Sequence, residues 1–364
     1  MSALPPVYLI DEPDTFPWQV FHHRHPALIR RLLDAHPYSP AQRAALTGLL
    51  AESLEGVIAP LADPLWQDWD RGHFGTPWAK APFLWAESYF YRRLLDAVDY
   101  FTTGVDPFAP FKTAELTDPA LADEYQWLAK DISLDTAVTA SLYGNQADLG
   151  FRLLTAGTDP IHQHLVVDDT QAVETWLADN APSRVNVVLD NAGRELLADL
   201  VLTDHLLTSG LARAVVLHVK PHPYFVSDAT CTDVHDCMRR LRGLPGGCGD
   251  RLHEAAAAGR LTIRTHPFHC APLSFVDMPG DLAAGLAEGL TVVKGDLNYR
   301  RLVGDRAWQP TSEFRQAVSY FPGPVTVLRI VKSEVVLGVR PERLSELPAG
   351  WRVSGKHAMV SAAL

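Results

Sequence analysis

One buried apolar run constrains the fold of this chain more than any other feature. Val185–Leu189 is apolar except for Asn186, and it ends abruptly at Asp190 and Asn191, with Gly193 just beyond. A β-branched run of this kind predicts a parallel strand that is buried on both faces. In open α/β sheets, ligands bind in the crevice outside the carboxyl ends of the strands. We therefore expect Asp190 and Asn191 to face a ligand site.

Other apolar runs in the second half of the chain have the same character. They are Ala214–Val219, Leu261–Thr265, Thr291–Val293 and Val325–Val331, with Val335–Val339 as an expected edge strand. Amphipathic segments lie around them and predict helices at Val167–Ala181, Glu195–Thr208, Ala229–Leu241 and Leu282–Glu288. Strands that alternate with helices predict an α/β fold, a three-layer Rossmann-like sheet with helices on both faces.

Helical spacing dominates the first half of the chain instead. Leu28, Ile29, Leu32 and Leu33 recur with a helical period, and Ser39-Pro40 is typical of a helix N-cap followed by proline. We expect an all-helical N-terminal domain at residues 1–165 and a Rossmann-like α/β domain that carries the ligand site at residues 166–364.

Composition excludes several classes of function. The 364 residues carry a formal net charge of -11 and no basic stripe, which argues against nucleic-acid binding. No apolar run reaches the roughly 18–20 residues that span a bilayer, and no signal peptide is evident, so no membrane partner is expected. The four cysteines form no C-x-x-C pair, which predicts a reduced, cytoplasmic protein.

Polar clusters follow four of the predicted strands. They are Asp190-Asn191, Ser227-Asp228, Lys294 to Asn298, and Lys332. Two carboxylates and an amide oxygen suit a hard divalent cation such as Mg²⁺ or Mn²⁺. Lys294 and Lys332 would supply positive charge for a phosphoryl group, and a bound metal would activate a water for attack on phosphorus.

Each cluster also has a structural interpretation. Asp228 could be the N-cap of the helix that follows it, and Lys294 to Arg301 could form a charged surface turn. Glu87 could form an internal ion pair with an arginine or point into a cleft. The histidines at His22 to His25 are poor metal ligands because adjacent positions point to different faces, and a solvated turn or helix start is expected there. His266, His269 and Cys270 are poor candidates for zinc because a tetrahedral set of ligands is missing nearby.

Common nucleotide and nucleophile motifs are absent from the sequence. Gly193 and Gly295 are single glycines, so there is no P-loop and no G-x-G-x-x-G dinucleotide fingerprint. The chain also has no G-x-S-x-G nucleophile elbow.

Several motifs resemble one family in the correct order. They are Leu189-Asp190-Asn191-Ala192-Gly193-Arg194-Glu195-Leu196, Lys220-Pro221-His222-Pro223-Tyr224-Phe225-Val226-Ser227-Asp228, Lys294-Gly295-Asp296-Leu297-Asn298-Tyr299-Arg300, Trp85 to Arg93 and Tyr143 to Leu149. Together they are similar to the metal-dependent damage-control phosphatases, the domain of unknown function 89 family. The most similar branch contains acidic-residue methyltransferase-like proteins and sugar-phosphate phosphatases.

This resemblance implies a phosphatase for small phosphorylated metabolites, such as fructose 1-phosphate or fructose 6-phosphate. It implies that Asp190, Asn191 and Asp228 hold a catalytic cation, with Mn²⁺, Co²⁺ or Ni²⁺ favoured over Mg²⁺. The residues implied to contact substrate are Glu87, Arg92, Asn145, Lys294, Gly295, Asp296, Asn298 and Lys332. Two alternatives stay open: an S-adenosylmethionine-dependent protein carboxyl methyltransferase, and a sugar-phosphate binding protein without catalysis. The oligomeric state is not predicted.

Overall fold

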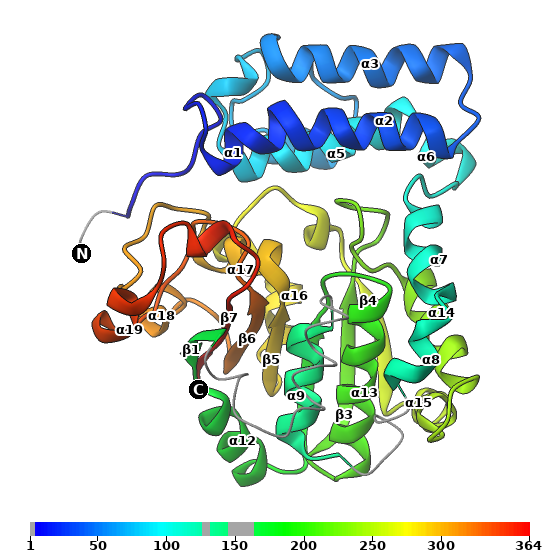
Figure 1. Ribbon diagram of the computed structural model, residues 1–364, viewed down its shortest axis with the longest axis vertical. Coiled ribbons are helices and arrows are strands. Elements are labelled where there is room, and N and C mark those ends of the chain that lie inside the picture. The colour runs from blue at the N-terminus through cyan, green and yellow to red at the C-terminus, as the bar shows by residue number, and fades with distance from the viewer. Residues whose placement is uncertain (1–3, 126–131, 145–163) are drawn as a thin grey trace.

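A helical part lies over the carboxyl ends of the parallel strands of a mixed β-sheet (Figure 1). The computed structural model describes residues 4–125, 132–144 and 164–364. The sheet has seven strands in the order β1-β7-β6-β5-β2-β3-β4. Their bounds are β1 Leu165–Asp168, β2 Ser183–Val188, β3 Ala212–Val219, β4 Leu261–Thr265, β5 Leu290–Lys294, β6 Val325–Ile330 and β7 Ala358–Ala363. Strands β6, β5, β2, β3 and β4 are parallel, whereas β7 is antiparallel to β6 and β1 is parallel to β7.

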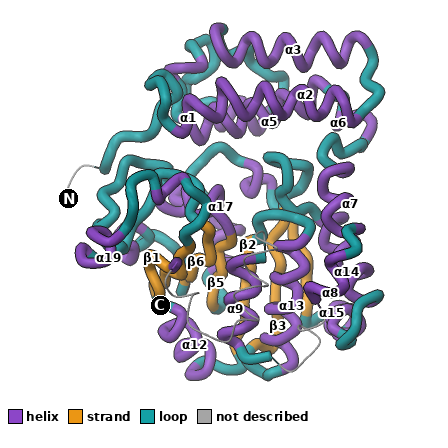
Figure 2. The backbone as a smooth tube through the Cα atoms, viewed as in Figure 1, coloured by secondary structure: helices purple, strands orange, loops and turns teal. Residues whose placement is uncertain are grey.

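Helices pack on both faces of this sheet, which confirms the predicted three layers (Figure 2). Successive residues of β2 show the alternation, because Val187 belongs to the core on one face and Val188 to the core on the other. The first core contains α9 Leu134–Tyr143, α12 Thr170–Asp179, α13 Arg194–Thr208, α14 Cys231–Arg242 and α15 Cys248–Ala257. The second contains α16 Gly280–Leu286, α17 Gly295–Val303 and α18 Phe314–Ala317.

The N-terminal helices form a core of their own. They are α1 Phe16–Gln19, the π-helix η1 Val20–Arg24, α2 His25–Ala35, α3 Pro40–Glu55, α4 Pro64–Trp69, α5 Phe83–Ala97 and α6 Tyr100–Thr103. Ser39 caps α3 as predicted, in a capping box with Gln42. The buried face of α5 carries Trp85, Tyr89 and Phe90 into this core, which explains why its sequence is apolar nearly all round.

The hydrophobic cores divide earlier in the chain than residue 165. The N-terminal core ends at Phe108, whereas Leu121, Val138 and Leu142 pack under the sheet. The helices that connect the two are α7 Ala109–Thr117 and α8 Ala120–Tyr125. The domain division expected from the sequence stays a prediction.

Short elements complete the described chain: η2 Trp78–Lys80, η3 Pro267–Cys270, η4 Phe275–Asp277, α19 Pro341–Glu346 and η5 Trp351–Val353. Across the described ranges, no helix has both the length and the apolar character needed to cross a bilayer.

Two expectations for the sheet edge were wrong. Val335–Val339 is not a strand, because Arg329 binds the carbonyl oxygen of Val335 and holds this segment as a buried loop. The start of the predicted helix at Val167 belongs instead to β1, and α12 begins only at Thr170.

Candidate active site

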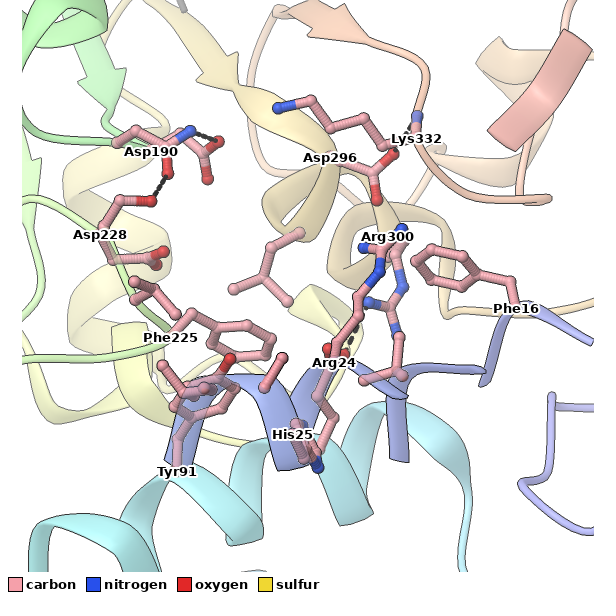
Figure 3. Close-up of a pocket in the computed structure, with 18 of the residues that line it drawn as sticks. Phe16, Arg24, His25, Tyr91, Asp190, Phe225, Asp228, Asp296, Arg300 and Lys332 are labelled. Atoms are coloured by element: carbon pink, nitrogen blue, oxygen red, sulfur yellow. Dashed lines mark hydrogen bonds and ion pairs between the residues drawn. The ribbon is translucent and has the colours of Figure 1, made fainter. Parts of the chain in front are cut away.

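The carboxyl ends of the parallel strands meet at a cavity of about 450 Å³. Asp190 and Asn191 follow β2, and Asp228 lies on the loop that follows β3. Lys332 comes just after β6. The opposite wall comes from the helical part and includes Phe16, Arg24, His25, Leu28, Arg31 and Tyr91. The cavity therefore lies between the two cores (Figure 3).

Backbone hydrogen bonds hold the two acidic loops together. The amide of Ala229 donates to the carbonyl of Asp190 at 2.7 Å, and the amide of Ala192 donates to the carbonyl of Ser227 at 2.6 Å. Asn191 and Asp228 thus form an isolated antiparallel bridge. The true N-cap of α14 is Thr230, which accepts from Asp233, so the alternative interpretation of Asp228 as a helix cap was wrong.

The side-chain amide of Asn191 has a defined orientation. Its Nδ2 donates to Asp190 Oδ2 at 2.9 Å and to Glu195 Oε2 at 2.8 Å, while its Oδ1 accepts from the hydroxyl of Ser227. An amide oxygen has two lone pairs, so one remains for a further partner. This arrangement makes the oxygen, and not the nitrogen, available as a metal ligand.

Gly295 begins α17 directly against Asp190. Its φ is +81°, and a Cβ atom built on it would lie 1.9 Å from Asp190 Oδ2. A side chain is therefore excluded at this position for both conformational and steric reasons.

The described contacts leave this site with an excess of negative charge. They connect four buried carboxylates, those of Asp190, Glu195, Asp199 and Asp228, with two buried ammonium groups, those of Lys220 and Lys294. A divalent cation would balance the difference. Asp228 Oδ2 is buried without a hydrogen-bond partner in the described chain, and its ion-pair partner Lys220 Nζ lies 3.3 Å away.

The pKa values of the two aspartates reflect the same imbalance. Burial raises the pKa of Asp190 well above its usual range, and the carboxylates of Glu195 and Asp228 add to this effect. Burial also raises the pKa of Asp228 to about 6, against the opposing charge of Lys220. The site thus favours added positive charge, and two carboxylates with an amide oxygen are donors that a divalent cation accepts.

No group of three or more His, Cys, Asp or Glu side chains in the described ranges is arranged to hold a metal ion. The candidate cation site therefore depends on the amide oxygen of Asn191 as its third protein donor. This set fits a hard cation that keeps water ligands, and it does not fit structural zinc.

Three predicted substrate residues line the cavity: Glu87, Asp296 and Lys332. Glu87 pairs with Arg300 Nη1 at 2.9 Å, so the expected internal ion pair is present on the cavity wall. Asp296 pairs with Arg329 at 2.7 Å and accepts from the backbone amide of Lys332 at 3.0 Å. Although burial opposes the effect, the charge of Arg329 holds the pKa of Asp296 below its usual value.

Other predicted substrate residues lie outside the cavity lining. Lys294 is buried beneath the site, where it donates to Ser141 Oγ at 2.9 Å and pairs with Asp199 at 3.0 Å. It does so because β5 ends under α13 and α9, both of which offer acceptors to its ammonium group. Asn298 is also buried and accepts from Lys220 Nζ at 3.1 Å.

Two further predictions concern the helical half. Arg92 pairs with Asp63 at 3.0 Å and Asp96 at 3.4 Å and stays away from the cavity, because it extends from α5 toward α4. Asn145 lies outside the described residues.

Several cavity and network residues were not predicted from the sequence. Arg24 and His25 belong to a cluster that reads as a solvated turn, yet both line the cavity. Glu195 and Lys220 lie within the quoted motifs, and their positions beside strand ends were the available signal. The local sequence did not indicate which face of the N-terminal helices would lie over the carboxyl ends of the strands.

The chain is similar to known proteins along most of its length. A family model described as the damage-control phosphatase ARMT1-like domain matches residues 20–347. Damage-control phosphatase ARMT1 of Danio rerio is 33% identical over 334 residues, which cover 78% of this chain and 73% of that protein. The Homo sapiens protein of the same name is 30% identical over 331 residues, covering 78% and 74%.

A solved structure also resembles this one. The crystal structure of a DUF89 family protein from Pyrococcus horikoshii superposes with a TM-score of 0.54, covering 95% of this chain and 98% of that chain. The sequence identity is 12%, so the likeness concerns the fold alone.

Proposed function

The chain belongs to the family of ARMT1-like damage-control phosphatase domains, and on that premise we propose that it hydrolyses small phosphate monoesters with a divalent cation held by Asp190, Asn191 and Asp228. The observation that carries this proposal is the meeting of two carboxylates and an oriented amide at one end of a cavity whose other end presents Lys332. Sugar phosphates such as fructose 1-phosphate and fructose 6-phosphate are the proposed substrates, and the cytoplasmic location stays a prediction.

A bound Mn²⁺, Co²⁺, Ni²⁺ or Mg²⁺ would supply charge for the phosphoryl oxygens and would acidify a water for attack on phosphorus. The chain's own residues would orient the ester. Lys332 would bind a phosphoryl oxygen from the side opposite the acids, and Asp296 would fix the backbone of Lys332 through its amide. Asn298 and Lys220 would hold the loops in place from below, since Lys220 also pairs with Asp228.

Glu195 has a supporting role in this proposal. It accepts from Asn191 Nδ2 at 2.8 Å and lies 3.6 Å from Lys294 Nζ, so it holds the amide with its oxygen turned toward Ser227. Loss of such an outer partner typically costs about 10- to 100-fold in metal affinity or activity.

The test is phosphate release by metal-stripped protein from fructose 1-phosphate and fructose 6-phosphate, with each of the four cations added back. We expect activity only after a cation returns. Asp190→Ala should lower the metal-dependent activity by more than about 100-fold, because loss of a residue that only supports a metal ligand already costs about 10- to 100-fold. Asp179→Ala removes an exposed acid at the end of α12 and serves as the matched control. Full metal-stimulated turnover by Asp190→Ala would overturn the assignment.

The methyltransferase and the non-catalytic binder gain no specific support from this site. Calorimetric binding of S-adenosylmethionine would favour the first. Metal-dependent binding of sugar phosphates without turnover would favour the second.

A further inference from the structure

The helical wall of the cavity carries a guanidinium group, that of Arg24, for which the described contacts include no ion pair. Glu87 is the nearby acid on which its charge acts, and the carboxylate of Glu87 is already bound by Arg300. Arg24 lines the cavity with an exposed side chain, and within the described ranges it has no ion-pair partner. Its guanidinium lies over the ring of Phe16 at 4.9 Å, a contact that supports the side chain without satisfying its hydrogen-bond donors. The donors of Arg24 thus remain available to a ligand.

The local helix geometry aims Arg24 into the cavity. Arg24 is the last residue of the π-helix η1, and α2 begins at the next residue. Val20, Arg24, Leu28 and Arg31 all line the cavity, so one helix face runs along it. Figure 3 shows Arg24 on the same side as Lys332 and Arg300, across from Asp190 and Asp228. Arg31 lies two turns further, about 10 Å along the helix axis, and would not reach the same anion.

The charges of the cavity lining separate into paired and free groups. Glu87 is paired with Arg300, Asp296 with Arg329, and Asp228 with Lys220. Lys332, Arg24 and Arg31 are cations of the lining for which the described contacts include no ion pair. Arg31 lies over the ring of Phe111 at 4.3 Å, too far along the helix to reach an anion bound at Arg24. One phosphoryl group between the cation site and Lys332 would use Lys332, which leaves the guanidinium of Arg24.

We propose that Arg24 binds a second anionic group of the substrate, a phosphate or a carboxylate remote from the scissile phosphate. The preferred substrates are then doubly anionic phosphometabolites instead of monophosphates with a neutral remainder. This inference rests on the proposed function and narrows its substrate class. A guanidinium suits the role because its planar donors bind both oxygens of such a group.

Matched pairs of compounds test the proposal. Fructose 1,6-bisphosphate differs from fructose 1-phosphate by a second phosphate, and 6-phosphogluconate carries a carboxylate where the equally acyclic glucitol 6-phosphate carries a hydroxymethyl group. The readout is the ratio of kcat/KM within each pair. We expect the intact protein to favour the doubly anionic member, and Arg24→Gln to reduce that ratio by about 10- to 100-fold, mainly through KM. Which pair responds distinguishes a phosphate from a carboxylate as the second group.

Two further variants separate binding from a structural effect. Arg24→Lys keeps the charge and should restore part of the ratio, whereas Arg30→Gln, an exposed neighbour outside the cavity lining, should leave it as it is. An unchanged ratio in Arg24→Gln, or no preference in the intact protein, would overturn the proposal. If no compound is hydrolysed with any cation, the proposed function fails, and the same ratios measured as calorimetric affinities still decide the role of Arg24.

Discussion

Asp190 dictates which residue can begin α17. The positive φ of Gly295 and the 1.9 Å approach of a hypothetical Cβ to Asp190 Oδ2 leave only glycine. The family resemblance implied that Gly295 contacts the substrate. The structure gives it a different task, because its missing side chain lets the carboxylate of Asp190 sit against the helix.

Gly295→Ala should therefore abolish metal-dependent phosphatase activity. Gly304→Ala is the matched control, since Gly304 also has a positive φ of +87° but its nearest atom lies 3.5 Å from the added Cβ. Both variants should lose about 1 kcal/mol or more of unfolding free energy from the strained backbone. Only the first should lose activity, measured as phosphate release. Equal loss of activity in both would contradict the account of Asp190.

For Lys294, the sequence predicted the position at a strand end but not the contacts of the side chain. A lysine at a strand end beside a glycine predicts a phosphate ligand, and the strand end is where it was expected. Its ammonium group nevertheless lies among Ser141, Glu195 and Asp199, which come from two helices distant in the sequence. Packing between these elements decides where the Lys294 side chain points, and the local sequence around Lys294 does not predict it.

Lys294→Met should lower the free energy of unfolding by about 3–5 kcal/mol, because it leaves two buried carboxylates without their cation. Lys80→Met removes an exposed pair with Asp11, 2.7 Å long, and should cost about 0–1 kcal/mol. Urea unfolding of both variants measures the difference. If Lys294→Met kept its stability and raised only KM, Lys294 would be a substrate ligand after all.

At the scale of elements, the central parallel strands were predictable because continuous apolar runs have few other interpretations. The edge was not. Ala358–Ala363 is short and mostly alanine and serine, so its sequence carries no strong strand signal, yet it pairs with β6 as β7. Val335–Val339 has the stronger strand propensity and is a loop, because the buried Arg329 takes its carbonyl group.

The contact between α2 and α5 includes a histidine with no hydrogen-bond partner in the described chain. His25 stacks on Phe90 with ring centroids 3.7 Å apart, and both of its ring nitrogens are buried and unsatisfied. Burial lowers the pKa of His25 to about 3. In the unfolded chain this residue protonates near pH 6.5, so between these values the unfolded state binds the additional proton.

The folded protein should therefore lose stability as pH falls below about 6.5, by up to about 1.4 kcal/mol per pH unit for this one group. His25→Phe keeps the aromatic stack and should make this slope shallower by about that amount, as measured by urea unfolding between pH 4 and pH 7. His23→Phe, at an exposed position of η1, should keep the slope. An unchanged slope in His25→Phe would contradict a buried neutral histidine.

At the scale of the whole molecule, the cavity exists because two cores are joined across it. The ion pair between Glu87 of α5 and Arg300 of α17 links them on one side, and Arg300 also lies over the ring of Phe83 at 4.4 Å. Lys112 of α7 pairs with Asp233 of α14 at 2.9 Å and adds a second link. The sequence predicted both parts, but not the relative placement that brings Arg24 opposite the acids.

The central claim is that a divalent cation held by Asp190, Asn191 and Asp228 is required for phosphate ester hydrolysis. Its most direct test is a titration of metal-stripped protein with Mn²⁺, with phosphate release from fructose 1-phosphate as the readout. Asp228→Asn keeps the shape of the ligand and removes its charge, and Asp179→Asn is the exposed control. We predict saturable activation of the intact protein and the control, and at least about a 10-fold loss in Asp228→Asn. Metal-independent phosphate release, or equal activation of Asp228→Asn, would contradict the claim.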